Sequence, residues 1–408
     1  MSLYADFPRG HPGAAKNAPL ATASWGATAT PWKEGDLWLG RDGDGVAVGH
    51  GDDRHAVLIA GSRSGKGRSV IIPNLFLWPG SCVVIDPKGE NARVTAASRA
   101  KREGHSVMVL DPLGVSEVPD ALRAAFNPLD LIDAGSDDAI DLAAAIGDAV
   151  MIGSGDGKDI HWTESGRQIF EGILLYVAVT ETGARRSLVR VRQLLTLGDP
   201  ELAARMTEAE RERDPDGEYG PVPPFAALWA GMADVTCEND AVRDVIAGAA
   251  NSIVDMGENE RGSVLSTARR NTKFIDSRWM RRCLSGLDEA GDAEATRRLD
   301  IDQLKASAGG LTAYVCLPAR FIPTHARFLR LVLNLMLFRL EAQGLDQPAC
   351  GHPVLFILDE FAALGRVEAI EKAAGLMAGF GVKLFTVLQD LGQLKRNFRE
   401  SWETFLGN

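Results

Sequence analysis

The sequence lacks the cysteine patterns that build a disulfide framework or a zinc site. Its five cysteines are odd in number, widely spaced along 408 residues and never arranged as C-x-x-C. Such usage is typical of reduced thiols in a cytoplasmic compartment and argues against a small disulfide-rich secreted protein. The seven histidines show no metal-ligand spacing either.

Long hydrophobic runs are also missing. The most apolar helical segment, residues 327–340, is interrupted by Arg330, Asn334 and Arg339, which predicts a buried helix rather than a membrane span. Residues 1–30 have no apolar core of the kind found in signal peptides. We therefore expect the chain as given to be soluble and cytoplasmic.

An excess of positive charge is absent as well. Lys and Arg number 44 against 55 Asp and Glu, and the net charge is −11. This balance argues against a generally basic nucleic-acid coat protein but permits local basic patches. What is present is a globular composition, 45% hydrophobic and 24% charged, which argues against disorder. The length is sufficient for two or three domains.

Short apolar strands that alternate with helical stretches predict a parallel α/β sheet. The predicted strands fall into two groups, at 56–60, 81–85 and 106–110, and then at 311–317, 354–358 and 383–388. Asp86 and Asp111, each followed by Pro, come directly after two of these strands. They bring carboxylates to the carboxyl edge of the sheet, where open α/β sheets bind ligands.

The N-terminal residues and the middle of the chain do not show this alternation of strands and helices. Residues 36–40 and 46–48 flank a Gly/Asp turn and predict a β-hairpin. Residues 1–35 have little periodicity and predict a loosely ordered arm. From about 131 to 300 there is almost no strand pattern, only helical stretches, which we interpret as an inserted all-α domain. A glycine-rich segment in that insert, 153–158, has no preceding strand and is interpreted as a loop.

The clearest chemical signal follows the first strand directly. Residues 60–67 have the sequence Ala-Gly-Ser-Arg-Ser-Gly-Lys-Gly and precede a helix, which is the position of a phosphate-binding P-loop. Backbone N–H groups and the helix N-terminus would surround the phosphates, and Lys66 would neutralise the β- and γ-phosphate oxygens. The residues expected to bind nucleotide in this way are Gly61, Ser62, Arg63, Ser64, Gly65, Lys66, Gly67 and Arg68.

Two positions depart from the usual P-loop pattern. Ala60 occupies the first glycine position, and Gly67 replaces the Ser or Thr whose hydroxyl normally ligates Mg²⁺. On this pattern alone, a simple Gly/Ser turn is an alternative to a nucleotide site.

An acidic pair after the strand at 354–358 has the form of a Walker B element. Asp359 is expected to hold Mg²⁺ directly or through water, and Glu360 to act as general base on the water that attacks the γ-phosphate. Gln389, after the last strand, could sense the γ-phosphate or orient water, or could cap a helix. A helix cap is also the alternative for the acidic pair, but the P-loop in the same chain favours ATP and Mg²⁺.

Basic residues cluster in the predicted insert. One group comprises Arg185, Arg186, Arg190 and Arg192, and the other comprises Arg261, Arg269, Arg270, Lys273, Arg278, Arg281 and Arg282. Contact with a phosphate backbone is one interpretation. A solvated helix face, or ion pairs between subunits, is the other and is somewhat favoured.

From about residue 50 to the end, these motifs resemble the type IV secretion coupling proteins of the TraG/TraD family, the ATPases of conjugation. The segments that carry the resemblance are 63–67, 71–75, 85–90, 126–130, 161–162, 260–267, 358–366 and 402–408. In the family's secretion branch Gly-Lys-Gly is common, so Gly67 fits the family.

The resemblance implies a RecA-like P-loop NTPase domain with a mainly parallel sheet, interrupted by the all-α insert. We therefore expect an N-terminal arm and hairpin over 1–50 and the first part of the nucleotide-binding domain over 51–130. The insert is expected over 131–300 and the second part of the nucleotide-binding domain, truncated at its C-terminal end, over 301–408.

The resemblance also implies partners and a place of action. Family members form homo-hexamers with ATP between subunits, and they move DNA, relaxase–DNA complexes or secreted protein effectors to the channel components of a type IV secretion system. They usually begin with membrane helices and work at the cytoplasmic face of the bacterial inner membrane. Arg327, Arg330 and Arg366 are candidates for the arginine finger.

Two other functions remain open from the sequence. One is a nucleotide-binding cargo receptor without turnover, and the other is a DNA translocase of the chromosome-partitioning type. The presence of Lys66, Asp359 and Glu360 favours an ATPase over the receptor, because a receptor needs no general base. The large helical insert counts against the partitioning motor.

Overall fold

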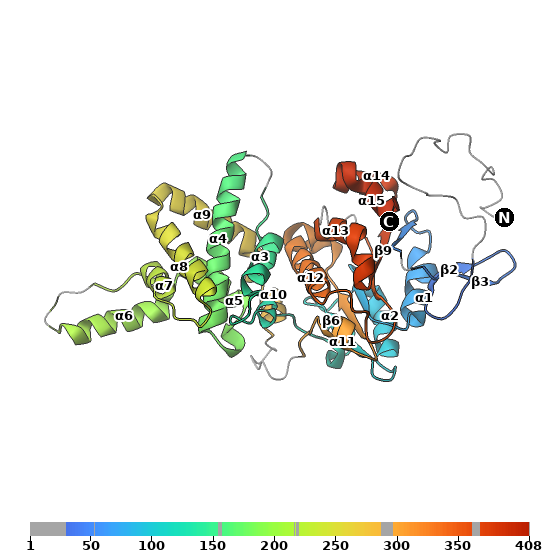
Figure 1. Cartoon of the computed structure of the whole chain (residues 1–408), viewed down its shortest axis with the longest axis horizontal. Coiled ribbons are helices and arrows are strands. Elements are labelled where there is room, and N and C mark those ends of the chain that lie inside the picture. The colour runs from blue at the N-terminus through green and yellow to red at the C-terminus, as the bar shows by residue number, and fades with distance from the viewer. Residues whose placement is uncertain are drawn as a thin grey trace.

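A computed structural model gives the fold of the chain. It describes residues 30–407 with the exception of 53, 154–156, 216, 218–219, 287–296 and 361–367. One half of the molecule holds helices alone, and the other half holds the strands with the helices that cover them (Figure 1).

The strands of the main sheet are parallel and come from both predicted groups. Their spatial order is β4 (Ala56–Ile59), β9 (Val382–Leu388), β8 (Val354–Leu358), β5 (Cys82–Ile85), β7 (Leu311–Val315) and β6 (Ser106–Leu110). All six predicted strands are therefore confirmed, within a residue or two at their ends. The two groups interleave, because β9 and β8 lie between β4 and β5.

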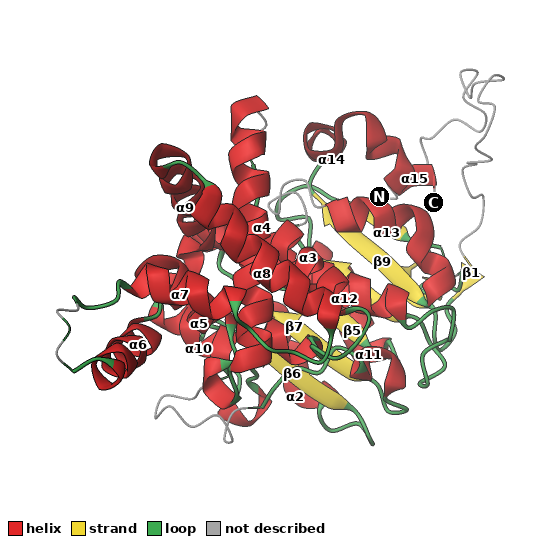
Figure 2. Cartoon of the chain, turned by 60° about the vertical axis from the view of Figure 1, so that its left-hand side comes forward, coloured by secondary structure: helices red, strands yellow, loops and turns green. Residues whose placement is uncertain are grey.

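Helices cover both faces of this sheet, as the apolar sequence of its inner strands requires. On one face, α1 (Ile72–Leu77) and α2 (Glu90–Arg99) pack on Val84 of β5 and its neighbours. On the other face, α12 (Ile322–Ala342) and α13 (Glu368–Leu376) pack on Val83 and Ile85 (Figure 2). Alternate residues of one strand thus belong to opposite layers of the core.

The helix α12 is the most apolar long helix that the structure describes. Together with the turn before it, over Ala319–Ala342, it is long and apolar enough to cross a membrane by length and composition, with a mean hydropathy of 1.2 over an 18-residue window. However, 56% of this 18-residue window is buried inside the protein. The predicted buried helix is confirmed, and Phe328 and Leu335 are among its fully buried side chains.

A small antiparallel sheet lies beside α1. It has the order β1 (Thr30–Pro31), β3 (Ala47–His50) and β2 (Leu37–Arg41), which confirms the predicted hairpin. The expectation of a loose arm over 1–35 is wrong for its last part, because Thr30 and Pro31 pair with β3. Residues 1–29 lie outside the described residues.

Two reciprocal hydrogen bonds join this small sheet to the main domain. The backbone N–H of Trp38 donates to Oδ1 of Asn74 at 2.7 Å, and Nδ2 of Asn74 donates to the backbone oxygen of Trp38 at 2.9 Å. The indole N–H of Trp38 donates to the backbone oxygen of Ser69 at 3.2 Å. The hairpin is thereby attached to the helix that follows the predicted P-loop.

Between β6 and β7 the chain is helical. The helices there are α3 (Ala139–Val150), α4 (Gly157–Thr180), α5 (Leu188–Leu197), α6 (Pro200–Arg213), α7 (Pro224–Ala233), α8 (Asp240–Asp255), α9 (Glu258–Thr272), α10 (Arg278–Ser285) and α11 (Gln303–Ala306). The chain closes with α14 (Leu391–Phe398) and α15 (Thr404–Gly407). Short 3-10 turns lie at Asp120–Leu122, Pro128–Leu131, Gly183–Arg185, Lys273–Asp276, Ala319–Phe321, Met377–Phe380 and Arg399–Glu403.

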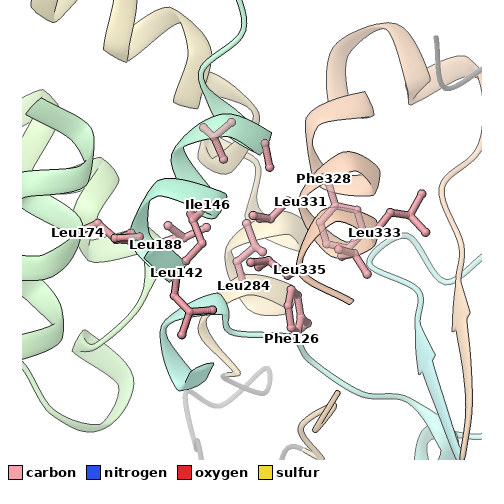
Figure 3. Close-up of a cluster of buried hydrophobic side chains, with 14 of the residues drawn as sticks. Phe126, Leu142, Ile146, Leu174, Leu188, Leu284, Phe328, Leu331, Leu333 and Leu335 are labelled. Atoms are coloured by element: carbon pink, nitrogen blue, oxygen red, sulfur yellow. The ribbon is translucent and has the colours of Figure 1, made fainter. Parts of the chain in front are cut away.

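The helical half and the sheet share one hydrophobic core. Leu142 and Ile146 of α3 lie between the side chains of α4 and α5 and those of α12 (Figure 3). The described residues of 131–300 form no strand, only a bridge between Ala125 and Arg298 at their border. The helical content expected of an insert is therefore present, while the division into domains at 131 and 300 stays a prediction.

Candidate active site

The predicted P-loop has the expected strand–turn–helix context. The backbone N–H of Ala60 still bonds to the oxygen of Leu388, at 3.0 Å, so the loop begins where the β4–β9 pairing ends. The helix begins with an irregular turn over Gly67–Ile71 that leads into α1. Gly65 has φ +85° and its oxygen accepts the N–H of Ser69 at 2.8 Å. Of the predicted phosphate-binding residues, Lys66 and Gly67 are half-buried and the other six are exposed.

The structure explains the first departure from the P-loop pattern, at Ala60, but not the second, at Gly67. Ala60 continues the sheet pairing and does not have the positive φ that would require glycine. Gly67 is not required by space either, since a Cβ at this position would meet no described atom within 4 Å. Arg63, in contrast, adopts φ +61°, a conformation that residues other than glycine rarely adopt.

The acidic pair lies at the end of β8. Asp359 and Glu360 are both half-buried, and the N–H of Glu360 donates to Oδ1 of Asp359 at 3.0 Å. Burial raises the pKa of Asp359, and the neighbouring Glu360 carboxylate raises it further, while the Lys66 ammonium lowers it. The structure therefore brings the P-loop lysine and the acidic pair into electrostatic contact.

Gln389 lies beside the acidic pair. Its side-chain Nε2 donates to Oε2 of Glu360 at 3.2 Å. The alternative of a helix cap for Gln389 is wrong, because Asp390 accepts the N–H of Gln393 at the start of α14. Gln389 follows β9, which lies between the strands of the P-loop and of the acidic pair.

Two residues after β5 complete the group: Asp86, which the sequence placed at the ligand-binding edge of the sheet without a specific role, and Lys88, which it did not single out. Asp86, after β5, is 1% exposed and accepts the N–H of Ala92 at 2.8 Å. Burial raises the pKa of Asp86 to about 6, and the charge of Asp359 adds to this shift. Lys88 has its Nζ 3.8 Å from Oε1 of Glu360. Their only signal in the sequence is an Asp-Pro-Lys segment directly after a buried strand.

Neighbouring strands thus deliver these groups to one edge of the sheet. In spatial order, β4 leads to Lys66, β9 to Gln389, β8 to Asp359 and Glu360, and β5 to Asp86 and Lys88. The arrangement offers a loop suited to phosphates, a cation, the carboxylates of Asp86 and Asp359, and a further carboxylate, Glu360, with a polar neighbour. These are the parts that a nucleoside triphosphatase requires.

The arginine-finger candidates are not brought to this group by any described contact. Arg327 donates to the backbone oxygen of Val150 at 3.2 Å and to Oδ1 of Asn271 at 2.8 Å. Its guanidinium is therefore engaged between α12, α3 and α9, which does not suit a residue that must reach another subunit. Arg330 lines a cavity of about 520 Å³ beside α13. Arg366 lies outside the described residues.

The first basic cluster has a structural role. Arg190 is paired with Glu181 at 2.7 Å and with Asp199 at 2.9 Å, and Arg192 is paired with Asp276 at 2.8 Å. The side chains of both arginines are at most 10% exposed. Arg185 and Arg186 are likewise bonded to acidic side chains and to backbone oxygens of the same chain. The phosphate-contact interpretation is therefore wrong for Arg190 and Arg192, whose side chains are buried in these pairs.

The second basic cluster is divided between inward and outward residues. Arg261 donates to the backbone oxygens of Val254 and Met256, and Arg269 donates to that of Leu195 at 2.8 Å. Four other residues of the cluster are exposed: Arg270, Lys273, Arg278 and Arg281. Only this exposed subset is available for contact with a phosphate backbone.

The fold and this edge of the sheet define a P-loop α/β protein. The family model described as "Type IV secretory system Conjugative DNA transfer" matches residues 14–219 and 229–408. The chain belongs to that family, and the predicted resemblance to type IV coupling proteins is confirmed.

The curated relatives are conjugation and secretion proteins. Conjugal transfer protein TraG of Escherichia coli is 26% identical over 366 residues, which cover 88% of this chain and 51% of the relative. Protein VirD4 of Rhizobium radiobacter is 24% identical over 377 residues, with 92% and 47% covered. The chain thus spans about half the length of these relatives.

Solved structures of the plasmid coupling protein TrwB have a similar fold. An unbound form matches with a TM-score of 0.58 at 14% identity and covers 92% of this chain and 71% of the TrwB chain. TrwB in complex with ADP and Mg²⁺ matches with a TM-score of 0.56 at 13% identity, over 90% of this chain and 72% of that one. This likeness shows the fold, and the predicted RecA-like P-loop fold class is confirmed.

Proposed function

We propose that this chain is the ATP-driven part of a conjugative coupling protein. It binds Mg-ATP at the P-loop, hydrolyses it, and uses the energy to drive DNA, a relaxase–DNA complex or secreted proteins to a type IV secretion channel. The observation that carries the proposal is the convergence of Lys66, Gln389 and the pair Asp359–Glu360 at one edge of the sheet. Membership of the family supports the class of cargo.

The phosphates would be held by residues 61–68. In this arrangement backbone N–H groups of the loop and the positive end of the following helix attract the phosphate oxygens. Lys66 adds a full positive charge, and the exposed position of the rest of the loop leaves it open to the ligand. Arg63 and Arg68 add charge at its rim.

The residues present fit a magnesium ion. Burial raises the pKa of both Asp359 and the buried Asp86, and the charge of Asp359 raises the pKa of Asp86 further. A cation would favour their charged forms, and Mg²⁺ prefers carboxylate oxygens together with water and phosphate oxygens. Because Gly67 offers no hydroxyl, we infer that Asp359 holds the ion directly or through water, with Asp86 behind it. When bound, the ion neutralises charge on the phosphates.

Glu360 would act as the general base. Water adds to the γ-phosphorus, its proton passes to the Glu360 carboxylate, and the bridging oxygen leaves with its electron pair on ADP. Gln389, which donates to Glu360 at 3.2 Å, would orient the same water. These roles separate an ATPase from a receptor that only binds nucleotide.

Comparing ATP binding with phosphate release in one preparation tests this proposal. The full-length protein should bind Mg-ATP by titration calorimetry and release phosphate at a rate that saturates with ATP. A receptor without turnover would bind ATP equally well and release none. Binding without release, in a preparation assembled on DNA, would favour the receptor over the ATPase.

The assembled state and the place of action belong to the same proposal. We infer a homo-hexamer at the cytoplasmic face of the inner membrane, in contact with the channel. The support is membership of the conjugative DNA transfer family. The exposed P-loop is compatible with a nucleotide that a neighbouring subunit covers.

A small basic surface of the helical half is proposed to contact cargo DNA. Replacing Arg270 and Lys273 by Ala should weaken the binding of single-stranded DNA, because both side chains are exposed at the end of α9. Each lost phosphate contact should reduce the log–log salt slope by about 0.7. Fluorescence anisotropy of labelled DNA at several salt concentrations measures this.

The control removes the same charge from another exposed helix. Arg211 and Arg213 lie at the end of α6 and are exposed, and their replacement by Ala should change neither the slope nor the affinity. ATP affinity should be unchanged in both double variants. Identical titration curves for the parent and the Arg270/Lys273 variant would restrict this surface to a structural role.

A further inference from the structure

The carboxylate of Glu360 is held from both sides by side chains of neighbouring strands. Gln389, after β9, donates its Nε2 to Oε2 of Glu360 at 3.2 Å. Lys88, after β5, has its Nζ 3.8 Å from the other oxygen, Oε1. The parallel pairing of β5 with β8, which sets Ile85 opposite Leu358, fixes this side of the arrangement.

Lys88 projects from a turn that is otherwise buried. Asp86, Pro87 and Gly89 are buried, whereas the Lys88 side chain is 66% exposed. The carboxylate of Asp86 accepts the N–H of Ala92, and the N–H of Gly89 donates to the backbone oxygen of Asp86 at 3.1 Å. The turn therefore fixes the backbone of Lys88 and leaves only its side chain outside.

The glycine after Lys88 lets this turn pack closely on the loop after β6. Gly89 has φ +67°, and a Cβ there would lie 2.6 Å from Cα of Ser116. No side chain fits in that space, so the turn packs directly on the loop after β6. That loop is itself held by the Asp111 carboxylate, which accepts the N–H groups of Val115 and Ser116.

Glu360 needs support of this kind because of its backbone. Its φ is +53°, in the left-handed region that residues other than glycine seldom occupy. Such conformations persist where surrounding contacts fix them, and they concentrate at functional sites. The contacts to Lys88 and Gln389 are the ones the described side chains make with this carboxylate.

We propose that Lys88 is a positioning residue for ATP hydrolysis. Its ammonium group holds Oε1 of Glu360, so that the carboxylate faces the water that Gln389 orients. This role rests on the proposed function of Glu360 as general base. An exposed pair of this kind adds little to stability, so its effect is on orientation.

The test measures kinetics of the full-length protein. Lys88→Ala should lower kcat by about ten- to a hundredfold, since misplacing a general base by about 1 Å has effects of this size. KM and the affinity for ATP should stay within about twofold, and Lys88→Arg should restore most of the lost rate. In a Glu360→Gln background, Lys88→Ala should have no further effect, because the lysine acts through that carboxylate.

A matched control comes from the same strand–helix unit. Arg93 of α2 pairs with Glu117 at 3.7 Å, a distance close to that of the Lys88 pair, and its side chain is 49% exposed. Arg93→Ala should keep the kcat of the parent, and thermal unfolding should show that both variants are folded.

The possible results distinguish the positioning role of Lys88 from the proposed role of Glu360 as general base. A raised KM with unchanged kcat in Lys88→Ala would overturn the positioning role, because it would make Lys88 a phosphate-binding group. A parental kcat in Lys88→Ala beside an inert Glu360→Gln would overturn the role of Lys88 alone. Equal turnover by Glu360→Gln and the parent would overturn the proposed general base, and the role of Lys88 with it.

Discussion

Glu360→Gln should leave ATP bound and lower its cleavage by about 10²–10⁴-fold, the usual contribution of a general base. The amide keeps the shape of the side chain and its contact with Gln389, but it cannot take a proton from water. Asp359, which sits beside the P-loop lysine, is unchanged, so the affinity for Mg-ATP should persist. Single-turnover phosphate release and titration calorimetry on the same full-length preparation measure the two quantities.

The control for this variant is Glu117→Gln, which removes a carboxylate that is 70% exposed and pairs only with Arg93 among the described residues. It should hydrolyse ATP at the parental rate. If Glu360→Gln does so too, the acidic residue after Asp359 has a structural role and the base lies elsewhere.

Lys66→Ala should weaken ATP binding by about a hundredfold, because it removes charged hydrogen bonds to phosphate oxygens. Lys66 is the P-loop cation that the structure brings into electrostatic contact with Asp359. The fold should survive, since the side chain is half-buried and belongs to a loop. Calorimetric titration with Mg-ATP measures the dissociation constant.

Lys101→Ala serves as the charge-matched control, since Lys101 is an exposed lysine just beyond α2. Its ATP affinity should equal that of the parent. An unchanged affinity in a folded Lys66→Ala protein would contradict the assignment of residues 61–68 as the phosphate-binding loop.

The strands and the P-loop could be predicted because their signals are local. A buried parallel strand needs a short apolar run, and runs such as 354–358 contain little else. The P-loop needs glycines at fixed places between a strand and a helix. Both patterns are complete within about fifteen residues of sequence, so neither depends on what the rest of the chain does.

The order of the strands could not be predicted in the same way. Parallel strands are joined by crossovers, so nothing local specifies that β9 lies between β4 and β8. For that reason the contact between Gln389 and Glu360 appears only in the structure, as does the approach of Lys88. The sequence named the candidate site residues, whereas their contacts with one another appear only in the structure.

The sequence also did not show which charged side chains are buried in ion pairs. Arg190 and Arg192 occur in a basic cluster, yet their carboxylate partners lie far apart in the sequence: Glu181 follows α4, Asp199 precedes α6, and Asp276 belongs to the turn after α9. A cluster of like charges along the chain is therefore not a cluster of like charges in space.

The position of β4 at the margin of the sheet has a thermodynamic consequence. Within the described residues β4 pairs with β9 alone, and Ile59 at its end is 43% exposed, whereas β8 is buried and paired on both sides. Opening of β4 therefore costs less free energy than opening of β8. A phosphate group held by the loop after β4 would raise that cost, since a ligand stabilises the state that binds it. Occupancy of the P-loop and the stability of this margin are thus linked, so binding and release of a nucleotide would raise and lower the stability of one side of the domain.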